Sequence, residues 1–291
     1  MSISVTRKRT LIAALLAVAW GCGGGTASTE TETAPAASAA KEPAAASGDA
    51  PADGHAEAKH EAEEPHEIHW GYEGEGGPSH WGGLKAEYEL CGSGKAQSPI
   101  DLKDAKKAKL AKLATSYKKS TFKINNNGHT IQVDLPEGST AKLSGKEYAL
   151  VQFHFHAPSE NTLDGKSFPM EMHLVHKNAD GELAVVGVFI EEGSAHPVID
   201  AIWPNLPTGE TDEPVACEGP IDPTGLLPKK KAYYAFNGSL TTPPCSEGVA
   251  WHVMADPIQL SSEQILRFTG YYDNNARPVQ PLNERAIQLS K

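Results

Sequence analysis

From about residue 68 to the C-terminus, short apolar segments alternate with clusters of Gly, Asn, Pro and charged residues. Many of these segments are rich in β-branched and aromatic residues, a composition typical of strands. They lie at residues 122–126, 129–135, 148–156, 171–177, 183–190, 232–236 and 249–254. Helical patterning is scarce: Ser261 and Gln264 form a capping box ahead of an apolar stripe that Gly270 ends. The pattern predicts one mainly β (α+β) domain over residues 67–291.

The first 21 residues have the order of a secretory signal. A basic stretch at residues 7–9 precedes an apolar run at 11–20, which is too short for a bilayer core that needs about 20 residues. Ala19-Trp20-Gly21-Cys22 also resembles the cleavage site of a bacterial lipoprotein signal. We therefore expect export from a bacterial cytoplasm to the periplasm or cell envelope, with a lipid anchor on Cys22. Plain secretion is the alternative.

Residues 23–67 contain no Leu, Ile, Val, Met, Phe, Tyr or Trp. Such a segment has nothing to bury and cannot offset its ordering entropy, so we predict a disordered tether over residues 22–66. His55, His60 and His66 lie in it at irregular spacing among glutamates. This spacing favours a solvated tail over a metal site.

The stretch Gln-Phe-His-Phe-His at 152–156 carries the strongest chemical signal. Alternate residues of a strand share a face, so His154 and His156 project together while the two phenylalanines point away. A turn over 158–165 lets a neighbouring strand bring His173 beside them. Three imidazoles fill three corners of a tetrahedron and leave the fourth open for water, the arrangement of a catalytic zinc site. No two cysteines have the spacing of a structural zinc site.

Gln152 lies two residues before His154, and Glu171 lies two residues before His173, so each shares a face with its histidine. Their oxygens can accept the second N–H of the imidazoles and so fix the tautomers. His176 has the opposite parity to His173. We predict that it points away from the metal and serves packing or hydrogen bonding.

Eight short motifs follow one another along the domain. They are His-Trp-Gly-Tyr (69–72), Gln-Ser-Pro-Ile (97–100), Asn-Gly-His (127–129), Gln-Phe-His-Phe-His (152–156), Ser-Glu-Asn-Thr (159–162), Met-Glu-Met-His-Leu-Val-His (170–176), Asn-Gly-Ser-Leu-Thr-Thr-Pro-Pro (237–244) and Arg-Pro-Val-Gln-Pro-Leu (277–282). Together they resemble the signature of the alpha-class carbonic anhydrases. The resemblance implies a large twisted, mostly antiparallel central sheet with a few short helices, and zinc at the bottom of a conical cleft.

The resemblance further implies a zinc-dependent lyase that reversibly hydrates CO2 to bicarbonate and a proton, with His154, His156 and His173 as ligands. In carbonic anhydrases zinc lowers the pKa of its bound water to about 7, so that zinc-bound hydroxide can attack CO2. Thr241 is then the gatekeeper. Its hydroxyl donates to an ionised Glu160 and accepts from the attacking hydroxide, which aims a lone pair at CO2.

CO2 is apolar, and the resemblance assigns it an apolar wall beside the metal. The expected pocket residues are Val175, Val185, Leu240, Thr242, Val249 and Trp251. Ordered water in the same cleft is assigned to Tyr72, Asn127 and Gln132. His129 takes the place of the proton shuttle, since an exposed imidazole has a pKa of about 6.5. Taken alone, these residues are also typical of a core or of turns.

Three cysteines remain once Cys22 is assigned to the lipid, and the sequence alone allows three pairings among them. The resemblance implies a disulfide between Cys91 and Cys245. Cys217 is then left over, either buried and inert or able to bridge two chains in a homodimer.

The formal net charge of −11 excludes nucleic acid as a partner, because a polyanion needs a basic surface. The expected partners are CO2 and bicarbonate, with a membrane contacted only through the lipid anchor. Two alternatives to the enzyme remain. One is a non-catalytic carbonic-anhydrase-like zinc-binding module, and the other is an exported zinc-binding protein that uses the histidines of the tether.

Overall fold

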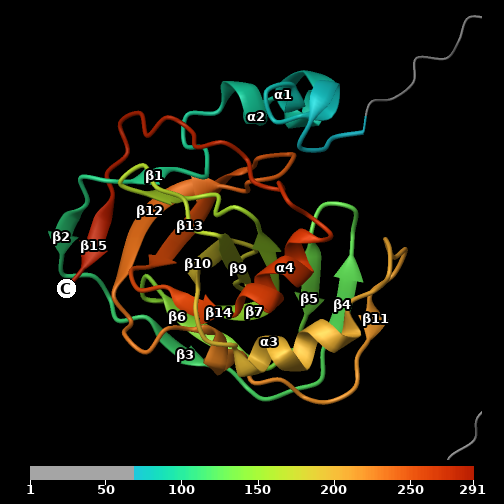
Figure 1. Ribbon diagram of the computed structural model, residues 1–291. Coiled ribbons are helices and arrows are strands. Elements are labelled where there is room, and N and C mark those ends of the chain that lie inside the picture. Colours follow the sequence, from blue (N-terminus) through green and yellow to red (C-terminus); the bar gives the residue numbers. More distant parts are fainter. Residues whose placement is uncertain (1–68) are drawn as a thin grey trace, which may run out of the picture. The chain divides into compact units, whose positions relative to one another are not determined.

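The computed structural model describes residues 69–291. The predicted signal, Cys22 and the tether lie outside these residues, so the predictions made for them stay predictions. Strands dominate the described chain and its helices are few and short, which confirms the mainly β prediction (Figure 1). Within residues 69–291, no helix is long and apolar enough to cross a membrane.

One sheet of 13 strands forms the centre of the domain, and most of its pairs are antiparallel, as expected. Its strands are β2 (Lys106–Ala108), β3 (Ala114–Ser116), β4 (Lys123–Asn126), β5 (Ile131–Asp134), β6 (Thr140–Leu143), β7 (Lys146–His156), β9 (Met170–Lys177), β10 (Leu183–Glu192), β11 (Val215–Ala216), β12 (Tyr233–Ser239), β13 (Glu247–Met254), β14 (Ile258–Leu260) and β15 (Gln288–Ser290). The main path runs β11-β4-β5-β7-β9-β10-β13-β12-β15-β2, while β3 pairs β6, β6 pairs β7 and β14 pairs β10. Parallel pairs occur at β10–β13, β10–β14 and β15–β2. Two further strands, β1 (Asp101–Leu102) and β8 (Thr162–Leu163), pair in parallel by themselves.

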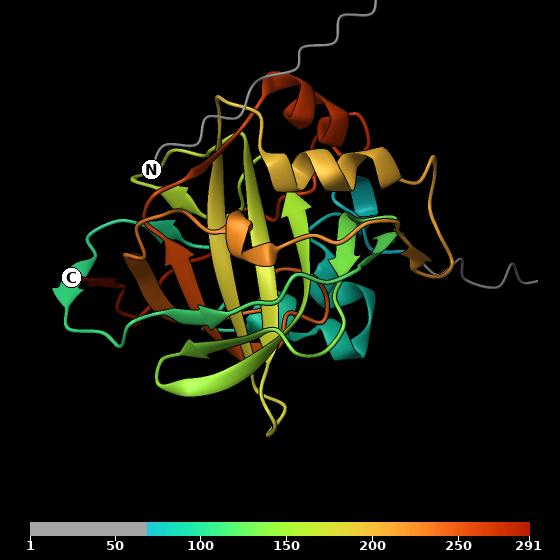
Figure 2. The same ribbon diagram turned by 90° about the horizontal axis from the view of Figure 1, so that it is seen from below.

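The helical elements connect and cover this sheet. The helices are α1 (Trp81–Leu84), α2 (Leu90–Ser93), α3 (Pro197–Ile202) and α4 (Ser262–Thr269), with 3-10 turns at Gly74–Gly76, Ala86–Tyr88, Trp203–Asn205 and Pro223–Leu226. Helices α3 and α4 lie close together beside one face of the sheet, where Trp203 Nε1 donates to the carbonyl of Gln264 at 2.8 Å (Figure 2). The predicted capping box of α4 is present, with Ser261 as its N-cap.

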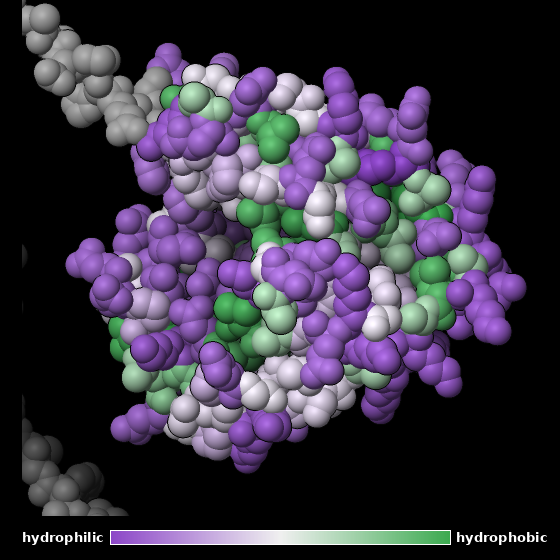
Figure 3. All heavy atoms as spheres, turned by 180° about the vertical axis from the view of Figure 1, so that it is seen from behind, coloured by the Kyte–Doolittle hydropathy of each residue, from purple (hydrophilic) through white to green (hydrophobic). Residues whose placement is uncertain are grey.

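All seven predicted strands are present, with ends displaced by at most three residues. Eight shorter strands were not predicted, namely β1, β2, β3, β6, β8, β11, β14 and β15. Partner strands stabilise them, and their own short sequences carry little strand pattern. Seen from behind, the surface is mostly hydrophilic, and apolar residues form several small groups (Figure 3). Such scattered exposure is normal for a folded domain.

Alternation along β7 sorts its side chains onto two faces. Phe155 is fully buried on the helix side and packs against Trp203 and Phe268, with ring centroids 5.0 and 5.8 Å apart. His154 and His156 point to the opposite face, where they line a cavity. The apolar core on one face therefore fixes the position of the polar side chains on the other.

His176 points away from this cavity, as its parity predicts, and is fully buried. Its Nδ1 lies 2.9 Å from the carbonyl oxygen of Leu174, and its Nε2 lies 2.8 Å from the hydroxyl of Tyr117. The carbonyl can only accept, so Nδ1 carries the proton and Nε2 accepts from Tyr117. The predicted hydrogen-bonding role of His176 is confirmed.

Candidate metal centre

Two adjacent strands bring three histidines together. His154 and His156 alternate along β7, and His173 on β9 stands directly opposite His154 in the antiparallel register. One ligand atom from each lies within 4.8 Å of the others. Among residues 69–291 this is the one cluster of at least three His, Cys, Asp or Glu side chains that could hold a metal ion. The three predicted ligands therefore converge as expected.

The outward nitrogen of each imidazole faces a fixed acceptor. His154 Nδ1 lies 2.9 Å from Gln152 Oε1, and His156 Nδ1 lies 2.8 Å from the carbonyl oxygen of Asn275. His173 Nε2 lies 3.2 Å from Glu171 Oε1. Gln152 Oε1 and the Asn275 carbonyl accept hydrogen bonds, so Nδ1 of His154 and of His156 carries the proton. The Glu171 carboxylate can only accept, and its position beside His173 Nε2 favours the proton on that nitrogen. Lone pairs are left on Nε2 of the first two rings and on Nδ1 of the third.

The local environment keeps the imidazoles neutral. Burial, and then the neighbouring imidazoles, hold the pKa of His154 and of His173 well below the usual range, and burial lowers the pKa of His156 to about 4. Within residues 69–291, the buried Nε2 of His156 has no hydrogen-bond partner, and it lies 3.4 Å from Glu160 Oε2, which also has none. A buried lone pair beside a carboxylate oxygen is unfavourable unless a proton or a metal cation lies between them. The donor set and this unpartnered atom fit a divalent metal such as zinc.

Glu171 has its own supports. Its two oxygens accept from the backbone and side-chain N–H groups of Asn161, each at 2.8 Å. Burial raises the pKa of Glu171 to about 7, against the effect of these hydrogen bonds. Gly187 on β10 stands opposite His173, and a Cβ there would lie 2.9 Å from Glu171 Oε1. Glycine thus leaves the space that the carboxylate occupies.

Glu160 is buried beside two of the histidines. Its Oε1 accepts from the backbone N–H of Arg277 at 2.9 Å, and the Thr241 side chain also hydrogen-bonds its carboxylate. Burial raises the pKa of Glu160 to about 8, while these two hydrogen bonds act in the opposite direction. The contact expected between Thr241 and Glu160 is therefore present.

A cavity of about 270 Å³ lies over the histidines and contains most of the predicted pocket residues. Its apolar lining includes Val175, Val185, Leu240 and Trp251. Its polar lining includes Tyr72, Asn127, Gln132 and Thr242.

The prediction that Val249 lines the pocket is wrong, because Val249 is not among the residues that line the cavity. Its side chain is 2% exposed and packs in an apolar cluster with Val185 and Trp251. Period-two spacing places Val249 on the face of Trp251, but enclosure by the cluster removes it from the cavity surface.

His129 lines the cavity but is not the exposed imidazole that the sequence predicts. The ring is half-buried and stacks on Trp70, with centroids 3.6 Å apart and planes at 15°. Its Nε2 lies 3.2 Å from Nε2 of His69. Burial, and then His69, lower the pKa of His129 to about 4. The predicted exposure of His129 is wrong, because His69 and Trp70 partly cover its ring.

Cys91 and Cys245 form a disulfide, which confirms the pairing implied by the resemblance. The backbone N–H of Cys245 donates to the carbonyl of Thr242 at 2.9 Å, so the disulfide is attached to the loop that carries Thr241. Cys217 is free and half-buried, and burial raises the pKa of its thiol.

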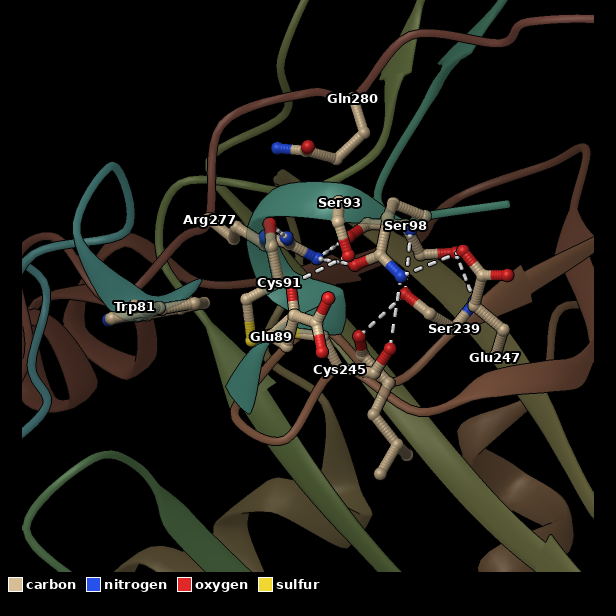
Figure 4. The surroundings of a disulfide bond; sticks show 12 residues. Trp81, Glu89, Cys91, Ser93, Ser98, Ser239, Cys245, Glu247, Arg277 and Gln280 are labelled. Carbon is tan, nitrogen blue, oxygen red and sulfur yellow. Dashed lines mark hydrogen bonds between the residues drawn. A yellow bond between two sulfur atoms is a disulfide. The ribbon is translucent and has the colours of Figure 1, made fainter. Parts of the chain in front are cut away.

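Arg277 connects this disulfide to Glu160. Its guanidinium donates to the carbonyls of Cys91 and Ser98 at 2.8 and 2.7 Å, and to Gln97 Oε1 at 2.9 Å. Figure 4 shows the Arg277 side chain beside the disulfide. One residue therefore bonds the disulfide segment through its side chain and Glu160 through its backbone.

Comparison with known proteins identifies the family. The family profile described as eukaryotic-type carbonic anhydrase matches residues 76–291. The chain belongs to the eukaryotic-type, or alpha, carbonic anhydrase family. This membership of an enzyme family confirms the resemblance inferred from the motifs.

Individual proteins, two of them named carbonic anhydrases, are similar over nearly the whole described domain. A carbonic anhydrase of Pectobacterium atrosepticum is 47% identical over 221 residues, which are 76% of this chain and 90% of that protein. The alpha-carbonic anhydrase of Thermovibrio ammonificans, solved with the inhibitor sulfanilamide, is 45% identical with a TM-score of 0.73, covering 77% of this chain and 99% of that one. Dioscorin complexed with ascorbate is similar at 34% identity and a TM-score of 0.69, covering 76% and 98%.

Several contributors to this carbonic anhydrase site were not predicted. Asn275 contacts His156, and Arg277 contacts Glu160, through backbone groups, and residue type does not reveal such contacts. Trp70 and Thr130 line the cavity. Trp70 and Arg277 stand inside quoted motifs, so those motifs could have drawn attention to them, whereas Asn275 lies outside every motif.

We predict that His173→Ala abolishes zinc binding at one equivalent of metal, because two imidazoles no longer complete the ligand set. Metal analysis after dialysis checks this result. His80→Ala changes an exposed histidine outside the centre and should retain one zinc per chain. Stoichiometric zinc in His173→Ala would contradict the ligand assignment.

We predict that replacing both Cys91 and Cys245 by Ser lowers the free energy of unfolding by about 2–5 kcal/mol, because the unfolded chain regains the freedom of a long loop. Urea denaturation followed by circular dichroism measures the change. Cys217→Ser is the matched control and should leave stability nearly unchanged. Equal stability of the double variant and the control would refute the prediction.

Proposed function

We propose that this member of the carbonic anhydrase family binds zinc and reversibly hydrates CO2 to bicarbonate and a proton. The observation that carries the proposal is the convergence of three inward lone pairs, on His154, His156 and His173, next to the contact between Thr241 and Glu160. These three histidines would hold the metal. Bound zinc supplies hydroxide as a nucleophile at neutral pH, as established for carbonic anhydrases.

Thr241 orients the attack on CO2. Its hydroxyl proton is engaged by Glu160, so its oxygen offers only lone pairs to the attacking oxygen. The attacking oxygen therefore donates its hydrogen to Thr241 and turns a lone pair toward the substrate. Glu160 must be ionised for this role. A divalent cation beside it lowers its pKa and opposes the effect of burial.

The apolar and polar sides of the cavity have different roles. Val175, Val185 and Leu240 offer CO2 an apolar surface and offer bicarbonate no hydrogen bond, which favours release of the product. On the polar side, Gln132 Nε2 donates to Asp134 Oδ1 at 2.7 Å. The amide oxygen of Gln132 thus stays available to a water donor. We assign ordered water on this side to the path by which the proton leaves.

Three further proposals concern the setting of the domain. The Cys91–Cys245 disulfide supports an oxidising compartment, in agreement with export through the segment at residues 1–21. We also propose a lipid anchor on Cys22. The third proposal is a homodimer bridged by Cys217, whose thiol is free.

A non-catalytic binding module is the second candidate function. The observation that favours it is the similarity to dioscorin, a protein solved with ascorbate. Such a module is expected to lack a metal ligand or the gatekeeper contact. This chain retains all three histidines and the Thr241–Glu160 pair, which favours the enzyme.

We predict fast CO2 hydration by residues 67–291 with the disulfide formed. Stopped-flow spectrometry should find that the rate falls to that of the buffer when zinc is stripped and returns with one zinc per chain. Stoichiometric zinc with hydration no faster than buffer would overturn the enzyme and leave the binding module.

We predict that Thr241→Ala lowers kcat/KM for CO2 hydration about 100-fold, because the nucleophile is no longer oriented. Zinc content should stay at one per chain, since Thr241 is not a ligand. Thr208→Ala, which changes an exposed threonine, is the control and should keep the parent rate. Unchanged kcat/KM in Thr241→Ala would remove Thr241 from the gatekeeper role.

A further inference from the structure

Two imidazoles meet at the edge of the cavity. His129 lines the cavity and is half-buried, whereas His69 is exposed. Their Nε2 atoms lie 3.2 Å apart, within hydrogen-bonding distance, and their ring planes are tilted by 22°. One end of this pair faces the cavity and the other faces solvent.

The pair is held from several sides. The ring of His129 stacks on Trp70, and its carbonyl accepts from Asn275 Nδ2 at 3.0 Å. Asn127 Oδ1 accepts from the backbone N–H groups of His129 and Thr130 at 3.1 and 3.0 Å. The backbone of His129 is held by Asn127 and Asn275, and its ring is held by Trp70, with His69 at its Nε2.

We propose that His69 is the second member of a two-imidazole relay that carries the proton from the cavity through His129 to solvent. The proposal rests on the proposed function, which produces one proton for each CO2 hydrated.

The relay takes up one proton from the cavity and releases one proton to solvent. A proton from cavity water adds to Nδ1 of His129, and the proton on its Nε2 passes to Nε2 of His69. His69 then releases its Nδ1 proton to bulk water. Reorientation of the two neutral rings restores the starting tautomers, and no electrons are exchanged.

Several titratable groups surround the pair. Burial and His69 lower the pKa of His129 to about 4, so this ring passes a proton on rather than retaining it. The Glu210 carboxylate lies about 3.3 Å from where a Cβ on Gly128 would stand, and Tyr272 is packed near the same turn. Glu210 supplies a negative charge beside the path, while the phenol of Tyr272, with a pKa raised to about 12, stays neutral.

The test compares zinc-loaded full chains carrying His69→Gln, His69→Ala, His129→Ala and the double change His69→Ala/His129→Ala. Glutamine can keep a hydrogen bond to His129 but cannot carry a proton. In dilute buffer, both His69 variants should lower kcat about tenfold and leave kcat/KM unchanged. The double variant should match His129→Ala, because serial steps are not additive, and added imidazole should restore kcat. His80→Ala is the control.

A second measurement does not depend on hydration. Proton NMR of the imidazole Cε1–H signals should show the titration midpoint of His129 shifting upward in His69→Ala, because His69 no longer lowers the pKa of His129. An unchanged midpoint would show that the two rings are not coupled and would overturn the relay. If the parent protein hydrates CO2 and His69→Gln keeps the kcat of the parent, the relay is overturned and the proposed function stands. A parent that binds zinc but does not hydrate CO2 would overturn the proposed function, and the relay with it.

Discussion

The antiparallel pairing of β7 with β9 is the constraint on which the site depends. It sets His154 opposite His173 and leaves His156 one step along the same face. A slip of one residue would turn every side chain of β7 to the opposite face and exchange imidazoles for phenyl rings. Phe155 is embedded among aromatic rings on the helix side, which makes such a slip costly. Packing on one face therefore fixes chemistry on the other.

Buried charge is the second organising feature. Glu160 and Glu171 are both inaccessible to water, and burial raises the pKa of each carboxylate. Arg277, also buried, supplies one positive charge nearby, and a divalent cation would supply two more. The carboxylates are held by N–H donors from Asn161 and Arg277 in positions that suit their ionised forms. The buried carboxylates thus suit a bound metal cation, whose positive charge the side chains of the protein do not supply.

Much of the fold and site could be predicted from the sequence, because both follow period-two alternation. The ligand faces of His154 and His173 and the acceptors Gln152 and Glu171 follow from spacing alone. The environment of His129 could not be predicted from the sequence, because it depends on contact with Trp70 at the N-terminal edge of the domain. Whether a residue such as Val249 lines a cavity or lies beneath it depends on three-dimensional enclosure. Alternation predicts the face of the sheet on which Val249 lies, but it does not predict whether the side chain reaches the cavity surface.

Residues near the C-terminal end hold two side chains of the metal centre in place. Asn275 supplies the carbonyl that orients His156, and Arg277 supplies the N–H that holds Glu160. Both residues lie close to the C-terminal end, more than 100 positions after the groups they hold. During synthesis the ligand histidines emerge long before these supports. The metal centre can therefore acquire its final geometry only when translation of the domain is almost complete.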